Sequence, residues 1–252
     1  MSDTYITSRK NPLLQQVRRL LTSRRERQES GLFVGDGVKL LEEAVRWYPG
    51  LHTVISTEDA LTCELPEHVR RFVVPRDVME TVSPMKAPQG ALFLCRLPEN
   101  TPPRLTPGCL ILDGIQDPGN LGTILRTADA LEVPVLLTEG CADPYNWKTV
   151  RASMGAVFRT QPVQTTADWV ARACAEGRIP LAVTALAQDA QDIRQARLEQ
   201  YAVVIGSEGQ GVGPTLMAHS DRKLIIPMQP HCESLNAAVA ATIVMWQMKL
   251  YR

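Results

Sequence analysis

The chain has 252 residues, of which 44% are hydrophobic and 21% are charged. Its 27 lysines and arginines equal its 27 aspartates and glutamates in number, so the formal net charge is zero. This composition excludes a disordered, collagen-like or low-complexity chain, and a chain of this length can bury a sizeable apolar core in one large domain or two smaller ones.

An amphipathic helix is predicted near the N-terminus. Apolar residues recur at helical spacing after Asn11 and Pro12, a pair that is typical of a helix cap and first turn. Residues 1–30 also contain seven lysines or arginines against three aspartates or glutamates. The arginines are therefore expected on the outer face of this helix. Taken alone, such a charge run is more often a solvated surface than a binding site.

Short strand-like runs alternate with a helical pattern in residues 31–97, which predicts an α/β domain. Strands are expected at 32–34, 53–55, 72–74 and 91–94, and a helix at 38–47. Four prolines within residues 97–107 then disfavour both helix and strand. We therefore interpret residues 98–107 as a linker between two domains.

A second α/β series follows in residues 108–252. Strands are expected at 109–112, 133–137, 181–184, 201–205 and 223–226, and helices at 122–131, 167–176 and 234–251. The strands are continuous apolar runs, which is typical of a parallel sheet that is covered on both faces.

Several functional classes are disfavoured. The six cysteines include no Cys-x-x-Cys pair and have no His partner at metal-ligand spacing, which predicts reduced thiols, a cytoplasmic protein and no metal site. No apolar stretch has the length of a signal peptide or a membrane span. The chain lacks a phosphate-binding Gly-x-x-x-x-Gly-Lys-Ser/Thr motif. Its glycine cluster at 206–213 is a weak match to a dinucleotide site, because Pro214 stands where the third glycine is required.

Three segments of the second half place polar residues at strand ends or helix starts. In the first, a loop with Asn120 runs into a helix with Arg126, and Asn120 could simply cap that helix. In the second, Ile-Gly-Ser-Glu-Gly-x-Gly at 205–211 ends a buried strand with glycines that let a ligand approach the main chain, although glycines there are also ordinary turn residues. In the third, Ile-Pro-Met leads to Ser234, a candidate N-cap, and to Asn236 in the expected first turn.

Together the three segments resemble a known family. The patterns Asn-x-Gly-x-x-x-Arg-x-Ala, Ile-Gly-Ser-Glu-Gly-x-Gly and Ile-Pro-Met followed by Ser-Leu-Asn are similar, in this order, to the signature motifs of the SpoU family of SPOUT-class RNA 2′-O-ribose methyltransferases. Residues 148–158 are also similar to this family. Residues 1–97 look like the small α/β RNA-binding domain, related to a ribosomal protein, that large-subunit rRNA methyltransferases of the family carry in front.

The resemblance implies a fold and a set of partners. Residues 108–252 would form a trefoil-knotted SPOUT methyltransferase domain with a parallel sheet, preceded by the smaller α/β RNA-binding domain at 1–97. The implied cofactor is S-adenosyl-L-methionine, the implied substrate is RNA, and no metal or membrane is required. The family also implies a homodimer. The apolar last helix could supply part of its interface, although core packing explains these residues equally well.

The resemblance also assigns site residues. Arg126 would contact the target hydroxyl or an adjacent phosphate, and Glu208 would orient the site and balance its charge. The substrate and neighbouring side chains would be held by Asn120, Ser234 and Asn236. Main-chain groups of Thr184, Gly206, Ile226, Met228 and Leu235 would contact the cofactor. The family's proposed general base is the first-motif arginine, but a guanidinium keeps its proton in proteins, so we favour oxyanion or phosphate stabilisation by Arg126.

The basic N-terminal residues are then better interpreted as RNA contacts, because phosphate neutralisation dominates nucleic-acid affinity. The RNA-binding candidates are Arg9, Lys10, Arg18, Arg24, Arg25 and Arg151. Two alternatives stay open: a tRNA ribose methyltransferase, and a catalytically idle RNA-binding factor of ribosome assembly. The long N-terminal domain favours rRNA over tRNA, and the intact motif residues disfavour the idle factor.

Overall fold

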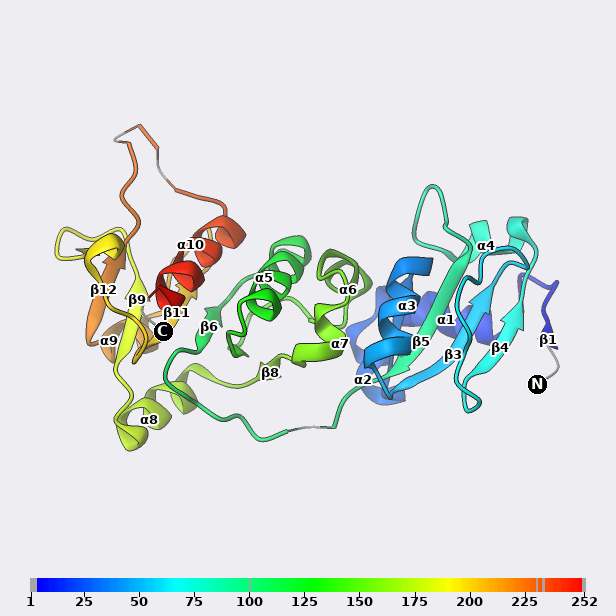
Figure 1. The fold of residues 1–252 in the computed structure, drawn as a ribbon, viewed down its shortest axis with the longest axis horizontal. Coiled ribbons are helices and arrows are strands. Elements are labelled where there is room, and N and C mark those ends of the chain that lie inside the picture. The colour runs from blue at the N-terminus through cyan, green and yellow to red at the C-terminus, as the bar shows by residue number, and fades with distance from the viewer. Residues whose placement is uncertain (1–3, 100, 230, 233, 251–252) are drawn as a thin grey trace. The chain divides into compact units, whose positions relative to one another are not determined.

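The structure, a computed structural model, describes residues 4–99, 101–229, 231–232 and 234–250. The chain forms two compact units (Figure 1). The first unit consists of Met1–Glu99 and Tyr145–Arg159, and the second of Asn100–Pro144 and Thr160–Arg252. The segment Tyr145–Arg159 thus belongs to the first unit although it follows the predicted linker in the chain.

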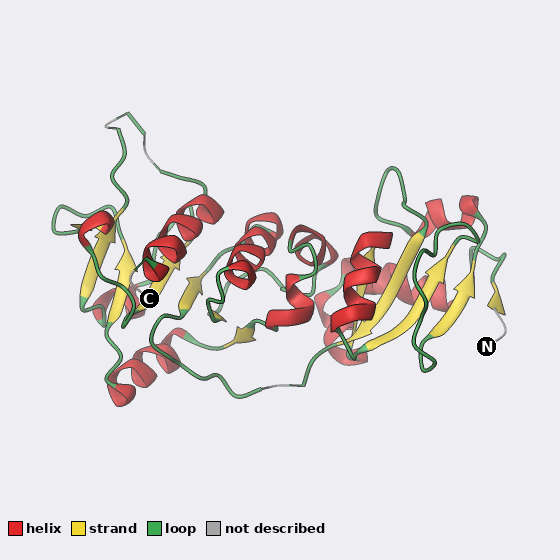
Figure 2. Cartoon of the chain, in the orientation of Figure 1, coloured by secondary structure: helices red, strands yellow, loops and turns green. Residues whose placement is uncertain are grey.

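The first unit contains a mixed five-stranded sheet (Figure 2). Its strands, in spatial order, are β1 (Thr4–Tyr5), β4 (Arg70–Val73), β3 (Leu51–Ser56), β5 (Ala91–Arg96) and β2 (Leu32–Asp36). The first three strands run parallel to one another, whereas β5 is antiparallel to both of its neighbours. All four strands predicted in this half are present, and the two-residue edge strand β1 is an addition.

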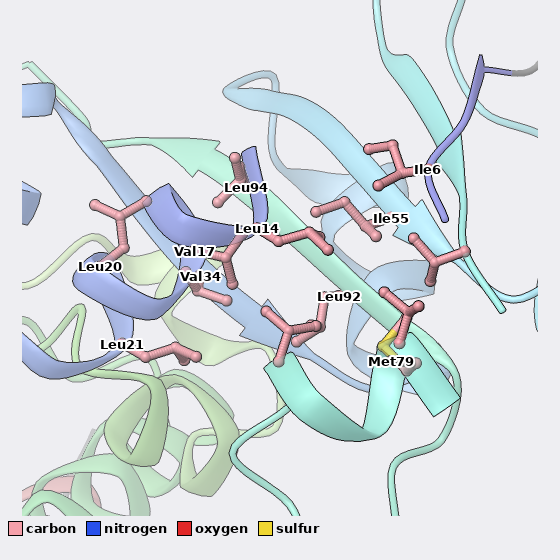
Figure 3. Close-up of a cluster of buried hydrophobic side chains, with 13 residues drawn as sticks. Ile6, Leu14, Val17, Leu20, Leu21, Val34, Ile55, Met79, Leu92 and Leu94 are labelled. Atoms are coloured by element: carbon pink, nitrogen blue, oxygen red, sulfur yellow. The ribbon is translucent and has the colours of Figure 1, made fainter. Parts of the chain in front are cut away.

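Helices cover this sheet, and their apolar faces explain why. They are α1 (Pro12–Thr22), α2 (Arg24–Ser30), α3 (Val38–Trp47) and α4 (Arg76–Val82). The side chain of Asn11 accepts a hydrogen bond from Leu13 N at 2.9 Å, which confirms the predicted start of the first helix. The buried face of α1 packs on the sheet beside α4 (Figure 3). The predicted helix at 38–47 is confirmed at both ends by α3.

The segment Tyr145–Arg159 of the first unit contains α6 (Trp147–Ala152) and all but the last residue of α7 (Ala156–Thr160). The segment that contains them brings aromatic rings onto β2: the ring centroid of Phe33 lies 4.9 Å from that of Tyr145 and 6.3 Å from that of Phe158. Arg159 also forms an ion pair with Glu43 of α3. Aromatic pairs at these separations add to the free energy of burial, which explains why this segment packs with residues so distant in the chain.

The second unit contains a seven-stranded sheet in which every pairing is parallel. Its strands, in spatial order, are β10 (Gln191–Asp192), β12 (Arg222–Ile225), β9 (Leu181–Thr184), β11 (Ala202–Gly206), β6 (Leu110–Asp113), β7 (Val135–Leu137) and β8 (Val163–Gln164). The parallel sheet expected from the continuous apolar runs is confirmed. The two-residue strands β8 and β10 at its edges were not predicted.

Helices lie against this sheet. They are α5 (Pro118–Ala130), α8 (Ala167–Gly177), α9 (Pro214–Ala218) and α10 (Ala237–Lys249), with a short 3-10 turn, η1 (Ile193–Gln195). Residues of α8 and α9 share one apolar core with β6, β9 and β11. The helices α5 and α10 pack against each other, and α10 also contacts β11.

Two helix caps differ from prediction. The last helix begins at Ala237 rather than at 234, because Asn236 is its N-cap and accepts hydrogen bonds from Ala238 N and Val239 N at 3.0 and 3.3 Å. Ser234 therefore does not cap it. The helix after β6 begins four residues earlier than expected, because the Asp117 carboxylate caps it by accepting from Asn120 N at 2.7 Å. Tyr251, the predicted end of the last helix, lies outside the described residues.

All six cysteines are free thiols. Burial raises the pKa of Cys109 to about 12 and that of Cys174 to about 11. These thiols therefore keep their protons at neutral pH and are poor nucleophiles. Within the part of the chain that the structure describes, no helix is long and apolar enough to cross a membrane.

Candidate active site

A cavity of about 490 Å³ opens at the carboxyl ends of β9, β11 and β12 in the second unit. Open parallel sheets bind ligands at this edge, where the loops after neighbouring strands converge. All five residues that the resemblance assigned to the cofactor line this cavity: Thr184, Gly206, Ile226, Met228 and Leu235. Glu208 and Ser234 line it as well. The second and third motifs are thus brought together around one space.

The glycine loop, residues 206–213, forms one side of this cavity and folds back on itself. Ser207 and Gly211 form an antiparallel bridge, with N to O distances of 3.1 and 3.0 Å. A Cβ atom on Gly206 would lie 2.1 Å from the carbonyl carbon of Gly211. No side chain fits at position 206, so the cavity is bounded there by main chain alone.

Asp113 holds the far end of the glycine loop, a role that the sequence interpretation missed. Its carboxylate, at the end of β6, accepts a hydrogen bond from Gly213 N at 2.7 Å and another from Thr138 Oγ1 at 2.5 Å. The carboxyl ends of β6, β7 and β11 are therefore joined through one side chain. A carboxylate that ends an otherwise apolar strand was the available signal.

Three motif residues form a hydrogen-bonded chain beside the cavity. The Asn120 amide donates from Nδ2 to Glu208 Oε1 at 2.5 Å, and Asn236 donates from Nδ2 to Asn120 Oδ1 at 2.9 Å. A carboxylate can only accept, so it fixes which end of the Asn120 amide faces it. The other end then remains for Asn236, whose own oxygen caps α10. Residues far apart in the sequence thus hold one another in a single orientation.

Arg126 lies on α5, the helix that also carries Asn120, and its side chain is exposed. It is not among the residues that line the cavity, and it makes no hydrogen bond or ion pair with any residue in the described part of the chain. Its guanidinium is therefore available to a ligand. Ser234 is exposed at the cavity rather than engaged in a helix cap.

The predicted RNA-binding residues lie in the first unit, and several already have partners. Arg9 pairs with Asp77 at 2.7 Å, and Arg25 pairs with Glu29 at 2.6 Å. Arg18 donates to the Arg9 carbonyl and to Thr81 Oγ1. The remaining three candidates, Lys10, Arg24 and Arg151, are exposed, and Arg151 contacts the sulfur of Met85. A phosphate would have to compete with these contacts for Arg9, Arg18 and Arg25.

Two family models match the chain. Residues 107–246 match the SpoU rRNA Methylase family, and residues 11–92 match the MRM3-like substrate binding domain. The chain is 33% identical to the 23S rRNA (guanosine(2553)-2′-O)-methyltransferase RlmP of Bacillus subtilis (strain 168), in an alignment that covers 97% of this chain and 98% of that protein.

Solved structures agree over both units. The SpoU methyltransferase AviRb of Streptomyces viridochromogenes, in complex with the cofactor AdoMet, has a TM-score of 0.81 at 27% identity and covers 95% of this chain and 97% of its own. The AdoMet-bound rRNA methyltransferase of Sinorhizobium meliloti has a TM-score of 0.85 at 26% identity and covers 98% of both chains. The chain therefore belongs to the SpoU rRNA methylase family and is an RNA ribose 2′-O-methyltransferase.

Proposed function

We propose that this chain methylates a ribose 2′-hydroxyl of 23S rRNA, with S-adenosylmethionine as the methyl donor. The observation that carries the proposal is the chain Glu208–Asn120–Asn236, which joins residues of all three motifs at the edge of one cavity. The full-length similarity to the Bacillus subtilis 23S rRNA enzyme supports the choice of RNA.

The cavity suits a nucleoside with a charged sulfur. The apolar side chains of Ile226, Met228 and Leu235 can enclose an adenine ring, while the main chain of the glycine loop offers hydrogen-bonding groups to its edge. The carboxylate of Glu208 faces the same space and can balance the positive charge of a sulfonium. When bound, S-adenosylmethionine supplies an electrophilic methyl group.

The protein's part in the reaction is positioning and charge stabilisation. In-line displacement by a hydroxyl needs an aligned nucleophile and a partner for the negative charge that develops on its oxygen. Arg126 has no competing contact with a described residue, so its guanidinium can bind that oxygen or a neighbouring phosphate. Asn120, Asn236 and Ser234 hold the ribose and Glu208 in place, and the hydroxyl proton leaves to solvent or to a substrate phosphate.

The RNA contacts expected at Arg9, Lys10, Arg18, Arg24, Arg25 and Arg151 form part of this proposal. The match of residues 11–92 to a substrate binding domain supports a role of the first unit in holding RNA. The arginines that are paired with Asp77 and Glu29 can exchange these exposed carboxylates for phosphates at little cost, because such surface pairs contribute only about 0–1 kcal/mol.

We also propose that the second unit is knotted and that it associates with a second copy of this chain through α10. Val239, Trp246 and Leu250 recur at helical spacing, and each is about half exposed or more, Trp246 at 60%. A stripe of this kind on a helix of a folded protein is typical of an interface.

The free thiols agree with a cytoplasmic location.

Arg126→Ala should abolish most turnover while leaving the cofactor in place. We expect methyl transfer to unmodified 23S rRNA to fall by about 100- to 1000-fold, because a charge-stabilising contact to the reacting oxygen is lost. Calorimetry should give an unchanged affinity for S-adenosylmethionine, and Arg172→Ala, which removes an exposed arginine on α8, should leave turnover unchanged. Mapping of 2′-O-methyl positions on the product RNA tests the reaction itself. Methylation of a base, or full turnover by Arg126→Ala, would contradict the proposal.

Gly206→Ala should weaken cofactor binding. The added Cβ atom would overlap the main chain of Gly211, so the glycine loop must move and the cavity loses its shape. We expect the Kd for S-adenosylmethionine to rise more than about tenfold. Gly177→Ala is the matched control, since its Cβ meets only Ile179 at 3.4 and 3.5 Å. Equal affinities of the two variants would show that the loop does not bound the cofactor site.

Trp246→Glu should separate the two copies. The carboxylate of the variant would lose its water in the associated state, which is unfavourable for an unpaired charge. We therefore expect light scattering to show one chain for the variant and two for the unaltered protein. Met154→Glu, at an exposed apolar residue of the first unit, is the control and should remain paired. A Trp246→Glu variant that keeps the mass of two chains would rule out this face.

A further inference from the structure

A second basic group lies at the end of the sheet of the first unit where β4 begins and β5 ends. Arg70 is the first residue of β4 and Arg96 the last of β5, and these strands flank β3 on either side. Arg70 is in register with Thr53, and Leu94 is also opposite Thr53. Residues that are opposite one another in register share a face, and so do residues two apart on one strand. Arg96 lies two residues after Leu94 on β5, so Arg70 and Arg96 project from the same face of the sheet.

These arginines carry charge that the described part of the chain leaves uncompensated. Both side chains are exposed, and neither forms an ion pair with a described residue. Arg70 donates to Thr53 Oγ1 at 3.4 Å, and the same hydroxyl lies 2.8 Å from His52 Nδ1. Burial lowers the pKa of His52, and the positive charges of Arg70 and Arg96 lower it further. The group therefore differs from Arg9 and Arg25, whose charges are offset by carboxylates.

An exposed aromatic ring completes this end of the unit. Arg96 N donates to Gly50 O and Tyr48 Oη donates to Arg96 O, both at 2.8 Å, so the end of β5 is joined to the segment that follows α3. The helix ends at Trp47, whose side chain is 47% exposed. The guanidinium of Arg46 lies 4.9 Å from the centroid of the Trp47 ring.

We propose that a surface at this end of the sheet binds the RNA substrate. This sheet-end surface consists of Arg46, Trp47, His52, Arg70 and Arg96. Arg70 and Arg96 contact phosphates, and Trp47 stacks on an unpaired base. The inference rests on the proposed function for the nature of the substrate. Clustered like charges repel one another unless an anion is bound, and RNA supplies phosphates at short, regular spacing. Sequence-specific RNA recognition commonly adds stacking of unpaired bases on aromatic side chains. The sheet-end surface offers both kinds of contact.

The charged part is tested with the double variant R70Q/R96Q in the full chain. We expect the Kd for a 23S rRNA transcript, measured by filter binding, to rise about tenfold or more. The slope of log K against log salt should fall by about 1.4 to 1.8, since two phosphate contacts are lost. The affinity for S-adenosylmethionine, measured by calorimetry, should not change.

The control is R76Q/R194Q, which removes two exposed arginines that are paired with Asp59 and Asp192 and should keep the RNA affinity and the salt slope of the unaltered chain. An unchanged salt slope for R70Q/R96Q would overturn the sheet-end surface. The failure of this proposal can be distinguished from the failure of the proposed function. If the chain binds RNA through this surface but never methylates it, only the proposed function is contradicted.

The aromatic part is tested separately with Trp47→Ala. Stacking carries no net charge, so the Kd for the same transcript should rise about fivefold or more while the salt slope stays that of the unaltered chain. A Trp47→Ala variant with unchanged affinity would remove the stacking contact from the proposal.

Discussion

The close main-chain contact between Gly206 and Gly211 is the constraint on which the site depends. It folds the glycine loop back at the end of β11, where a side chain on Gly206 would overlap the next turn of backbone. Asp113 fixes the other end of the loop through Gly213 N. With both ends held, Glu208 projects from the loop toward Asn120. The cavity and the polar chain beside it are therefore two results of one backbone conformation.

The polar chain gives the site a defined direction. Glu208 can only accept hydrogen bonds, so the donor end of Asn120 faces it and the acceptor end faces Asn236. Asn236 in turn uses its oxygen to cap α10. The orientation of the Asn120 amide is thus linked through Asn236 to the start of the last helix, and directly to the Glu208 carboxylate. Such mutual fixing lowers the reorganisation needed when a substrate binds.

Much of this arrangement could be predicted from the sequence. The spacing of apolar residues gave α3 and β9 with their observed bounds, and the continuous apolar runs gave a parallel sheet. Short strands such as β8 and β10 have only two residues each, too few for a periodic pattern. Ser234 looked like a cap because its residue type suits one, but the amide of Asn236 reaches the first free N–H groups instead.

The parts that could not be predicted are those made by residues distant in the chain. Asp113 and Gly213 are 100 residues apart, and nothing local links them. The basic residues near the N-terminus lie close together in the sequence, but the carboxylate that neutralises Arg9 belongs to Asp77, which lies 68 residues further along the chain. Arg70 and Arg96 are far apart in the sequence and lie at the same end of the sheet because β4 and β5 flank the same strand.

A crystal structure of the chain with S-adenosylmethionine tests the central claim most directly. The account predicts that the ligand occupies the cavity beside the glycine loop, with its adenine against Ile226 and Leu235 and its methyl group facing the Glu208–Asn120–Asn236 chain. A ligand bound at any other edge of the second unit, or one whose methyl group faces away from these three side chains, would contradict it.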